Sequence, residues 1–384
     1  MAVISQVHGQ ICAICIMDES DPDITFNADG VCNHCEAFKE MASAGWFPGP
    51  EGVPQLEAMI AEIKVAGAEQ EYDCILGLSG GVDSSYLALK IKDFGLRPLV
   101  FHVDAGWNSE LAVNNIQRIV DYCGYDLFTF VVNWEDMRNL QLSYLKAGVS
   151  NQDVPQDHIF FSTLYHYATK HNIKYILSGG NLATEGVFPS SWQHSAMDAW
   201  NLHAIHRKFG RHRLEEYKTI SPLQYYFYYP FVKGMRTVRP LNFMEYNKKT
   251  ALRELVEDVG FKEYGRKHGE SRFTRLIQNH YYPVYIGHDI RRPHLSSLVV
   301  SGQMTRDEAL EAMEEPLYDP VELERDLNYL AKKLGISRDQ LNEILQWPKH
   351  RHSDFRTWNR FQAFVKLGQQ GIARLTGRSL KRYS

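Results

Sequence analysis

The feature that most constrains the fold is a short apolar segment followed at once by a glycine pair and a helix. Residues 73–78, Asp-Cys-Ile-Leu-Gly-Leu, are typical of a buried parallel strand, and residues 84–92 predict a helix. Glycines let a backbone approach a phosphate closely, and the N–H groups at a helix start carry positive partial charge. We therefore interpret the connection as a phosphate-binding loop, which reads Ser79-Gly80-Gly81-Val82-Asp83-Ser84-Ser85.

This loop differs from the two commoner nucleotide-binding loops. It lacks the Gly-Lys-Ser/Thr ending of a Walker A motif, and it does not follow the GxGxxG pattern of dinucleotide sites. The alternative, a plain glycine turn before a serine-capped helix, stays open at this point.

Strands and helices are expected to alternate beyond the loop, which predicts a doubly wound parallel α/β sheet. The other expected strands are 98–103, 127–132 and 174–177, and the intervening helices are 111–122, 136–146 and 160–171. An earlier helix is expected at 55–66, and the region past 240 is expected to be helical at 245–259, 305–313, 320–334, 338–346 and 356–375. We predict a zinc knuckle and linker at 1–50, a nucleotide-binding core at 55–240, and a mostly helical region at 241–384 for substrate or partner binding.

Four of the 6 cysteines form two CxxC pairs near the N-terminus, Cys12 with Cys15 and Cys32 with Cys35. Two such pairs at this separation are typical of a tetrahedral zinc site, and four protein ligands leave no open position, so the zinc is expected to be structural. Unligated thiols or two disulfides are the alternative. The remaining cysteines, Cys74 and Cys123, are expected to be buried in or near strands.

Polar residues follow two further strands, at the edge where open α/β sheets bind ligands. The loop and these strand ends resemble the PP-loop ATP pyrophosphatase superfamily, which includes synthetases of NAD, GMP and asparagine. That resemblance implies ATP, with its departing diphosphate on the loop and its adenosine near His102, Asp104, Trp107 and Asn108. It also places the segment Gly179-Gly180-Asn181-Leu182-Ala183-Thr184-Glu185 beside the nucleotide, and it implies that Asp83 and Glu185 hold Mg²⁺. Glu185 as an ordinary acid at a helix start remains the alternative.

Further motifs resemble the N-acetyl sugar amidotransferase family of bacterial O-antigen and nonulosonic-acid biosynthesis. The likeness runs from the cysteine pairs almost to residue 315. It includes Asp104-Ala105-Gly106-Trp107-Asn108-Ser109-Glu110, Pro155-Gln156-Asp157-His158, Lys267-His268-Gly269-Glu270-Ser271-Arg272-Phe273-Thr274-Arg275, Asp289-Ile290-Arg291-Arg292-Pro293-His294-Leu295-Ser296-Ser297 and Ser301-Gly302-Gln303-Met304-Thr305-Arg306. Ala105 and Arg266 depart from the pattern, and the tail past residue 320 is not matched.

The resemblance implies that the enzyme adenylates the acetamido oxygen of a nucleotide-linked N-acetyl sugar. Ammonia then replaces that oxygen, which gives an acetamidino sugar, AMP and pyrophosphate. Catalytic roles are expected for Asp83, Lys267, His268, Glu270, Arg275, Arg291 and Arg292, with the cations gripping phosphates. The alternative for Lys267, Arg275, Arg291 and Arg292 is that each is a surface or ion-paired cation. His158 and His294 are further candidates for proton transfer.

The partners expected are the sugar nucleotide and a glutaminase, because the chain shows no glutaminase signature of its own. The family resemblance implies a two-component ammonia source similar to the subunits of imidazole glycerol phosphate synthase. A net charge of −4 gives no general attraction to nucleic acid. Without a signal peptide or an apolar span, the protein is expected to work in the cytoplasm, away from membranes.

Two other functions compete with this interpretation. A tRNA-modifying PP-loop enzyme would use the basic stretch from Lys349 onward to grip a phosphate backbone. Thiolation would need a reactive cysteine, however, and only Cys74 and Cys123 remain after the zinc site. A non-enzymatic nucleotide-binding module fits the sheet but gives the motifs at 267–275 and 291–297 no role.

Overall fold

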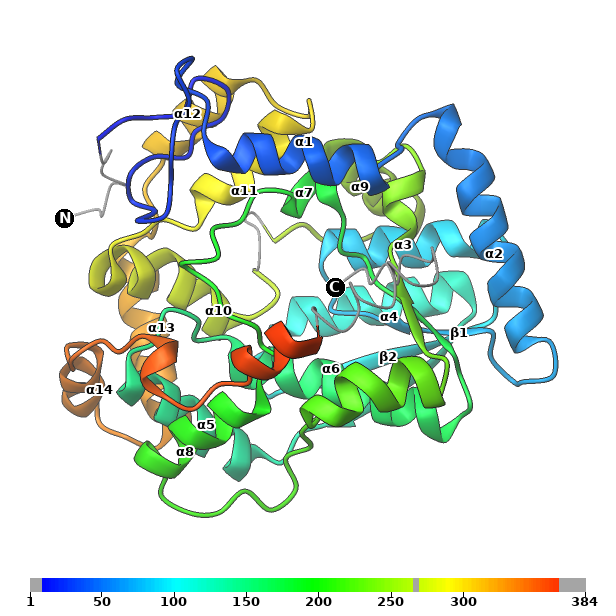
Figure 1. The fold of residues 1–384 in the computed structure, drawn as a ribbon. Helices are drawn as coiled ribbons and strands as arrows, with labels where there is room; N and C mark the ends of the chain where they lie inside the picture. Colours follow the sequence, from blue (N-terminus) through cyan, green and yellow to red (C-terminus); the bar gives the residue numbers. More distant parts are fainter. Residues whose placement is uncertain (1–8, 265–268, 366–384) are drawn as a thin grey trace.

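The computed structural model describes residues 9–264 and 269–365 (Figure 1). At its centre is a five-stranded sheet in the order β3-β2-β1-β4-β5, with every neighbouring pair parallel. The strands are β1 (Cys74–Gly77), β2 (Pro98–Asp104), β3 (Asp126–Val131), β4 (Tyr175–Leu177) and β5 (Arg236–Val238). The predicted fold class, a doubly wound parallel α/β sheet with an N-terminal cysteine cluster and a helical C-terminal region, is confirmed.

Side chains alternate between the two faces of the sheet, and each face is covered by its own set of helices. Cys74 and Leu76 pack with α2 (Val53–Gly67), α3 (Val82–Asp93), α4 (Glu110–Cys123) and α9 (Lys248–Glu254). Ile75 packs on the opposite face with α5 (Trp134–Ala147), α6 (Val154–Lys170) and α8 (Ala199–Phe209). Burial on both faces explains the continuous apolar run of β1. Each buried Leu or Ile side chain contributes about 1.5–3 kcal/mol.

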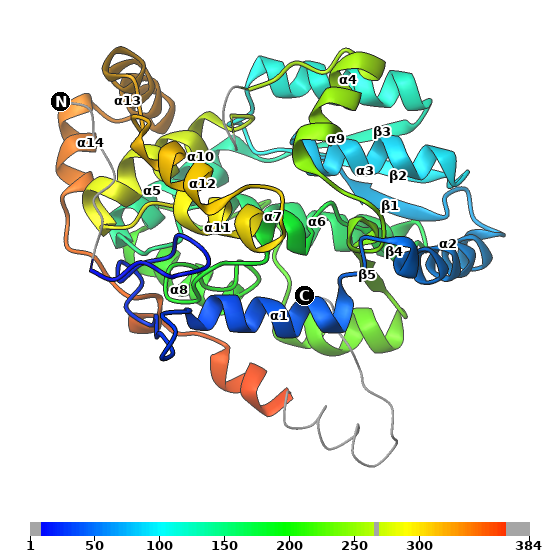
Figure 2. The same ribbon diagram turned by 90° about the horizontal axis from the view of Figure 1, so that it is seen from above.

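The C-terminal helices lie beside the sheet rather than on it, as both views show (Figures 1 and 2). They are α10 (Arg272–Leu276), α11 (Arg291–Val300), α12 (Arg306–Glu314), α13 (Pro320–Leu334) and α14 (Arg338–Leu345). The remaining helical segments are α1 (Asn33–Gly45), α7 (Leu182–Glu185), the short turns Pro50–Gly52, Pro240–Phe243 and His352–Asp354, and the π-helical stretches Gln224–Val232, Leu255–Val259 and Ile277–Ile286. No helix in the described part of the chain is long and apolar enough to cross a membrane.

Most expected elements are present, but their ends differ and several further elements were not expected. Helix α6 begins at Val154 rather than near residue 160, because Pro155 is tolerated in a first turn. The helix expected at 356–375 begins at residue 359, and its part past 365 lies outside the described residues. Sequence periodicity did not predict the three-residue edge strand β5 or the helical segments α1, α7, α8, α10, α11, Gln224–Val232 and Ile277–Ile286.

Helix α11 holds the N-terminal cysteine segment against the rest of the molecule. The Arg292 guanidinium pairs with Asp18 at 3.1 Å, and both side chains are almost fully buried. The same guanidinium donates to the carbonyl oxygen of Ile16 at 2.8 Å, and Ser296 Oγ accepts from the N–H of Ile16 at 3.2 Å. Arg306, at the start of α12, donates to the carbonyl oxygens of Cys12 and Cys15.

We call the contacts of Arg292 with Asp18 and Ile16 the Arg292 clamp. Substitution of Arg292 should have a large effect on stability. Arg292→Ala leaves the Asp18 carboxylate buried without its counter-ion, so the free energy of unfolding should fall by about 3–5 kcal/mol. Arg236 provides the control because its pair with Glu62 is exposed on both sides. Arg236→Ala should cost less than about 1 kcal/mol in urea denaturation. Wild-type stability for Arg292→Ala would contradict the structural role.

Candidate functional site

The predicted phosphate loop leaves β1 and starts α3 with a tight, internally bonded turn. Gly80 has a φ of +83°, which favours glycine, and the Tyr264 hydroxyl donates to its carbonyl oxygen at 2.8 Å. Ser79 Oγ accepts from the N–H of Gly81 at 3.2 Å and lies 3.1 Å from Ser84 Oγ. Gly81 is the N-cap of α3 and has no side chain, so no side-chain cap occupies the first-turn N–H groups.

A second loop, which follows β4, lies directly against the start of α3. A Cβ atom placed on Gly179 would lie 2.7 Å from the backbone nitrogen of Ser84, so only glycine permits this contact. Asn181 caps α7 by accepting from the N–H of Thr184, and its amide nitrogen donates to the carbonyl oxygen of Gly179. The two strand ends therefore face one ligand space, as expected for the carboxyl edge of a parallel sheet.

These loops line a cavity of about 960 Å³. Of the residues predicted to bind ligands or to act in catalysis, those that line it are Ser79, Gly81, Val82, Asp83, Ser84, His102, Asn108, Gly179, Gly180, Asn181, Glu185 and Glu270. The cavity is large enough for a nucleotide together with a second substrate.

Four predicted cofactor-binding residues do not line the cavity. Gly80 forms the turn, and Ser85 is fully buried. Trp107 is 1% exposed and packs against Trp134 and Phe273, so it belongs to the core. Asp104 accepts from the N–H of Gly106 and from the amide of Asn108, and it therefore helps to orient Asn108, which does line the cavity.

His102 is held as a neutral imidazole. Its Nδ1 lies 2.9 Å from the carbonyl oxygen of Leu78, which can only accept, so Nδ1 carries the proton. Its Nε2 then accepts from the Asn108 amide nitrogen at 3.0 Å. Burial lowers the pKa of His102 and favours this form. The histidine therefore fixes how Asn108 faces the cavity.

Three carboxylates surround the phosphate loop. Asp83 accepts a short hydrogen bond from the Tyr246 hydroxyl. Burial and then the charges of Asp83 and Glu185 raise the pKa of Tyr246, so both carboxylates lie near this hydroxyl. Glu270 lies over the loop, because a Cβ atom on Gly81 would lie 3.5 Å from its Oε1. Asp83 and Glu185 fit a Mg²⁺ ion shared with phosphates, since this ion is usually bound by one or two carboxylates plus phosphate oxygens.

Three arginines that were expected to contribute to an anion pocket, Arg275, Arg291 and Arg292, make other contacts in the structure. Arg275 pairs with the buried carboxylate of Asp326. Arg291 pairs with Asp289 at 2.7 Å and donates to carbonyl oxygens at the end of α12 and just beyond it. Arg292 forms the clamp to Asp18. None of the three lines the cavity, while Lys267 and His268 lie outside the described residues.

The two histidines suggested for proton transfer differ in position. His158 is fully buried, lies within hydrogen-bond distance of the carbonyl oxygen of Ala196 through Nδ1, and accepts from the N–H of Ile220 through Nε2. Burial lowers its pKa to about 4, so it is a neutral structural residue. His294 lines the cavity.

Sequence reasoning missed the far wall of the cavity. It gave no roles to Asn151, Asp153, Gln156, Asp157, Trp192, Thr274, Tyr282 and His288, which line this wall. It also gave none to Arg239, which lines the cavity beside Gly180. Two signals in the sequence could have found this wall. One is the motif Pro155-Gln156-Asp157-His158, which carries part of the family resemblance, and the other is the spacing of Asp153 and Asp157, which places two acids on one face of a helix start. Burial and the neighbouring Asp153 raise the pKa of Asp157 to about 8.

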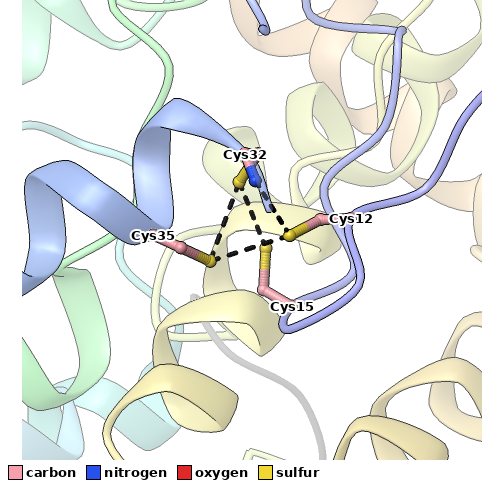
Figure 3. A group of neighbouring side chains, drawn as sticks. All are labelled: Cys12, Cys15, Cys32 and Cys35. Atoms are coloured by element: carbon pink, nitrogen blue, oxygen red, sulfur yellow. Dashed lines mark hydrogen bonds between the residues drawn. The ribbon is translucent and has the colours of Figure 1, made fainter. Parts of the chain in front are cut away.

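The four N-terminal cysteines point toward one centre (Figure 3). Sulfur–sulfur distances of 3.7 and 3.8 Å join Cys12 to Cys35, Cys15 to Cys32 and Cys32 to Cys35. A Zn–S bond of ~2.3 Å in a regular tetrahedron implies an edge of about 3.8 Å, so the thiols fit zinc. Backbone N–H groups of Ile14 and Met17 also donate to the sulfurs. All six cysteines lie within the described residues, and none of them forms a disulfide.

The other two cysteines are buried, as predicted. Burial raises the pKa of Cys74, and it raises the pKa of Cys123 to about 11. Thiolates are therefore disfavoured at both positions, which argues against either residue as a persulfide carrier for thiolation.

The cysteine geometry predicts one structural zinc per chain. Elemental analysis should find one equivalent in the wild type and in Cys123→Ser, and far less in Cys32→Ser. Removal of the metal by a chelator should lower the unfolding temperature, because the site connects α1 to α11. A native protein that holds no zinc, or a chelator that leaves the melting curve unchanged, would defeat this assignment.

Residues 270–368 match the family described as "LPS biosynthesis protein WbpG-like, C-terminal domain". Comparison with curated proteins finds no match. Solved structures with similar folds include NMN synthetase from Francisella tularensis, at 13% identity, with 78% of this chain and 97% of that chain covered and a TM-score of 0.36.

NAD⁺ synthetase from Burkholderia pseudomallei is 15% identical, with 78% of this chain and 95% of that chain covered and a TM-score of 0.31. The NH₃-dependent NAD synthetase from Campylobacter jejuni is 16% identical, with 34% of this chain and 58% of that chain covered and a TM-score of 0.27. Overlaps at these TM-scores carry no information on substrate or mechanism.

The family match extends well past residue 320, where the motif resemblance could no longer be followed. The predicted likeness to enzymes of bacterial surface polysaccharide synthesis is therefore confirmed for the C-terminal domain, whose residues 270–368 are similar to those of WbpG-like proteins of LPS biosynthesis.

Proposed function

We propose that this chain is an ATP-dependent amidotransferase of bacterial surface polysaccharide synthesis. It transfers AMP to the acetamido oxygen of a nucleotide-linked N-acetyl sugar and lets ammonia replace that oxygen. The observation that carries the proposal is the glycine loop at the start of α3, which opens into a cavity of about 960 Å³ beside Asp83 and Glu185. A phosphate site, two carboxylates and space for a second substrate together favour nucleotidyl transfer.

The loop supplies what a departing diphosphate needs. Because Gly81 offers no side-chain cap, the first N–H groups of α3 are available to phosphate oxygens, and the helix dipole favours their charge. By its resemblance to PP-loops, this segment holds the β- and γ-phosphates, so the α-phosphate faces the acceptor. Preorganised donors of this kind stabilise charge as it develops in the transition state.

The carboxylates explain why a divalent cation belongs here. Asp83 and Glu185 line the same cavity as the loop, and carboxylates beside phosphates repel them unless a cation lies between. When bound, Mg²⁺ would neutralise charge on the leaving diphosphate. The Tyr246 hydroxyl holds Asp83 in place by donating to it.

The proposed reaction balances without any further reagent. The amide C–O bond breaks, its oxygen leaves on AMP, and one new C–N bond forms to ammonia. Of the four hydrogens on the amide nitrogen and ammonia, three remain on the amidinium product and one leaves as a proton. Pyrophosphate departs in the first step, so ADP is never formed.

Ammonia is scarce at neutral pH because most of it is ammonium. We therefore propose a separate glutaminase partner, similar to the subunits of imidazole glycerol phosphate synthase that the family resemblance implies. In support, the only cysteines outside the zinc cluster are buried and poorly ionised, so neither suits a glutaminase nucleophile.

Asp83→Asn tests the proposal at the phosphate loop. We expect AMP and pyrophosphate release to fall by about 100-fold or more, because the metal loses a ligand while the side-chain shape is kept. Asp93→Asn, at the exposed end of the same helix, should retain wild-type rates. The assay contains ATP, Mg²⁺, ammonium chloride and UDP-linked N-acetylhexosamines, with products measured by chromatography and mass spectrometry.

Product identity decides the outcome. A sugar nucleotide in which one oxygen is replaced by NH, formed together with AMP, is the predicted product. Formation of ADP, or full activity of Asp83→Asn, would contradict the proposal. Tight, salt-sensitive retention of tRNA by the full chain would instead favour the RNA-modifying alternative.

A further inference from the structure

The far wall of the cavity carries a pair of carboxyl groups that the proposed nucleotide site does not use. Asp153 and Asp157 lie one turn apart at the start of α6, and both line the cavity. Thr274 Oγ1 and the Gln156 amide donate to Asp153 at 2.9 and 3.2 Å. No described residue donates a hydrogen bond to Asp157. One carboxyl is therefore fixed by its neighbours, and the other faces open space.

Two nearly buried side chains in the same region each have a ring nitrogen without a hydrogen-bond partner among the described residues. Trp192 and His288 line the cavity at 4% and 5% exposure, and their rings stack with centroids 4.2 Å apart. Neither Trp192 Nε1 nor His288 Nε2 finds a partner within the described residues. An unsatisfied buried polar group costs about 1–3 kcal/mol, so these atoms favour a ligand that supplies the missing hydrogen bonds.

Tyr282 connects these groups into one compartment. Its ring centroid lies 5.1 Å from that of His288, and the charges of Asp153 and Asp157 both act on its hydroxyl. We call the space lined by Asp153, Asp157, Thr274, Tyr282, Trp192 and His288 the acidic compartment. It combines a flat aromatic pair, carboxyl groups and unpartnered nitrogens, which is the chemistry that receives a polar, uncharged ring such as a pyranose.

We propose that the acidic compartment binds the acetamido end of the acceptor, with Asp157 in contact with the amide that becomes an amidine. This inference rests on the proposed function. It also narrows the substrate class, because an acceptor with a carboxylate at this end would face two further carboxyl groups, whose proximity disfavours another negative charge. The phosphates of the sugar nucleotide must therefore point away from this wall.

A change in the protonation of Asp157 would allow it to bind both the substrate amide and the amidinium product. Because its pKa is raised to about 8, the carboxyl is mostly neutral at pH 7 and can donate to the amide oxygen. The amidinium product is a cation, for which the ionised pair is the natural counter-ion. Asp157 therefore changes from donor to anion as the neutral amide becomes a charged amidinium, and its proton leaves to solvent.

The groups around Asp157 set the direction of its pH dependence. Burial raises its pKa most, and the charge of Asp153, at the start of the same helix, raises it further. Tyr282 and His288 line the compartment from other segments, and the charge of Asp157 also acts on the buried Tyr217. Burial keeps all three side chains neutral near pH 7. The neutral carboxyl is therefore present below pH 8 and lost as pH rises through about 8.

The first experiment compares wild type, Asp157→Asn and Asp339→Asn at constant free ammonia. Asp339 is an exposed control on α14. For wild type and Asp339→Asn, KM for the active UDP-linked N-acetylhexosamine should rise about tenfold between pH 7 and 9, as one proton is lost. Asn can donate but cannot ionise, so Asp157→Asn should keep KM constant within about twofold and lose kcat by about tenfold or more.

A second measurement does not depend on activity. Acetamide stands in for the amide of the substrate, and acetamidinium chloride stands in for the amidinium of the product. Their binding is followed by NMR of the carboxyl signals in protein labelled with ¹³C-aspartate. Acetamidinium should shift the signal that is absent from Asp157→Asn, and it should bind more tightly at pH 9 than at pH 7. Acetamide should show the opposite preference.

The outcomes separate the two proposals. If wild type forms no AMP with any acceptor, the proposed function fails and this inference fails with it. If AMP forms but Asp157→Asn shows the wild-type pH profile of KM, only the acidic compartment is overturned. If acetamidinium leaves the ¹³C carboxyl signal of Asp157 unchanged at both pH values, the proposed role of the acidic compartment is also overturned.

Discussion

The candidate site depends on one close contact between the ends of two neighbouring strands. Gly179, after β4, lies so near the backbone of Ser84 that any Cβ atom would collide with it. This contact brings the start of α3 and the segment that carries Glu185 to one edge of the sheet. The glycine loop and a second carboxylate then face the same cavity, which neither strand could achieve alone.

Much of the remaining molecule holds this edge in place. Helix α11 contacts the segment around Glu185, since Ser297 Oγ accepts from the N–H of Val187 and Ser301 Oγ donates to the carbonyl oxygen of Ala183. Through Arg292 the same helix grips the cysteine segment. Zinc at the cysteines would therefore stabilise one wall of the cavity without taking part in the chemistry.

Local features could be predicted from the sequence, and long-range partners could not. The strand, the glycine loop and the helix around Ser79–Ser85 follow from adjacent residues, so their pattern was sufficient. The role of Arg292 depends on Asp18, which is far away along the chain, and a cluster of cations cannot reveal whether its partner is a ligand or a buried acid. Asp157 became a candidate only through burial next to Asp153, a property of the folded chain.

The central claim is that the glycine loop holds the diphosphate that leaves ATP. A crystal structure of the protein with Mg²⁺ and a non-hydrolysable α,β-methylene analogue of ATP tests this most directly. The account predicts the β- and γ-phosphates against the N–H groups that begin α3, within Ser79–Ser85, and the metal between them and Asp83. A triphosphate bound at any other place on the chain would contradict it.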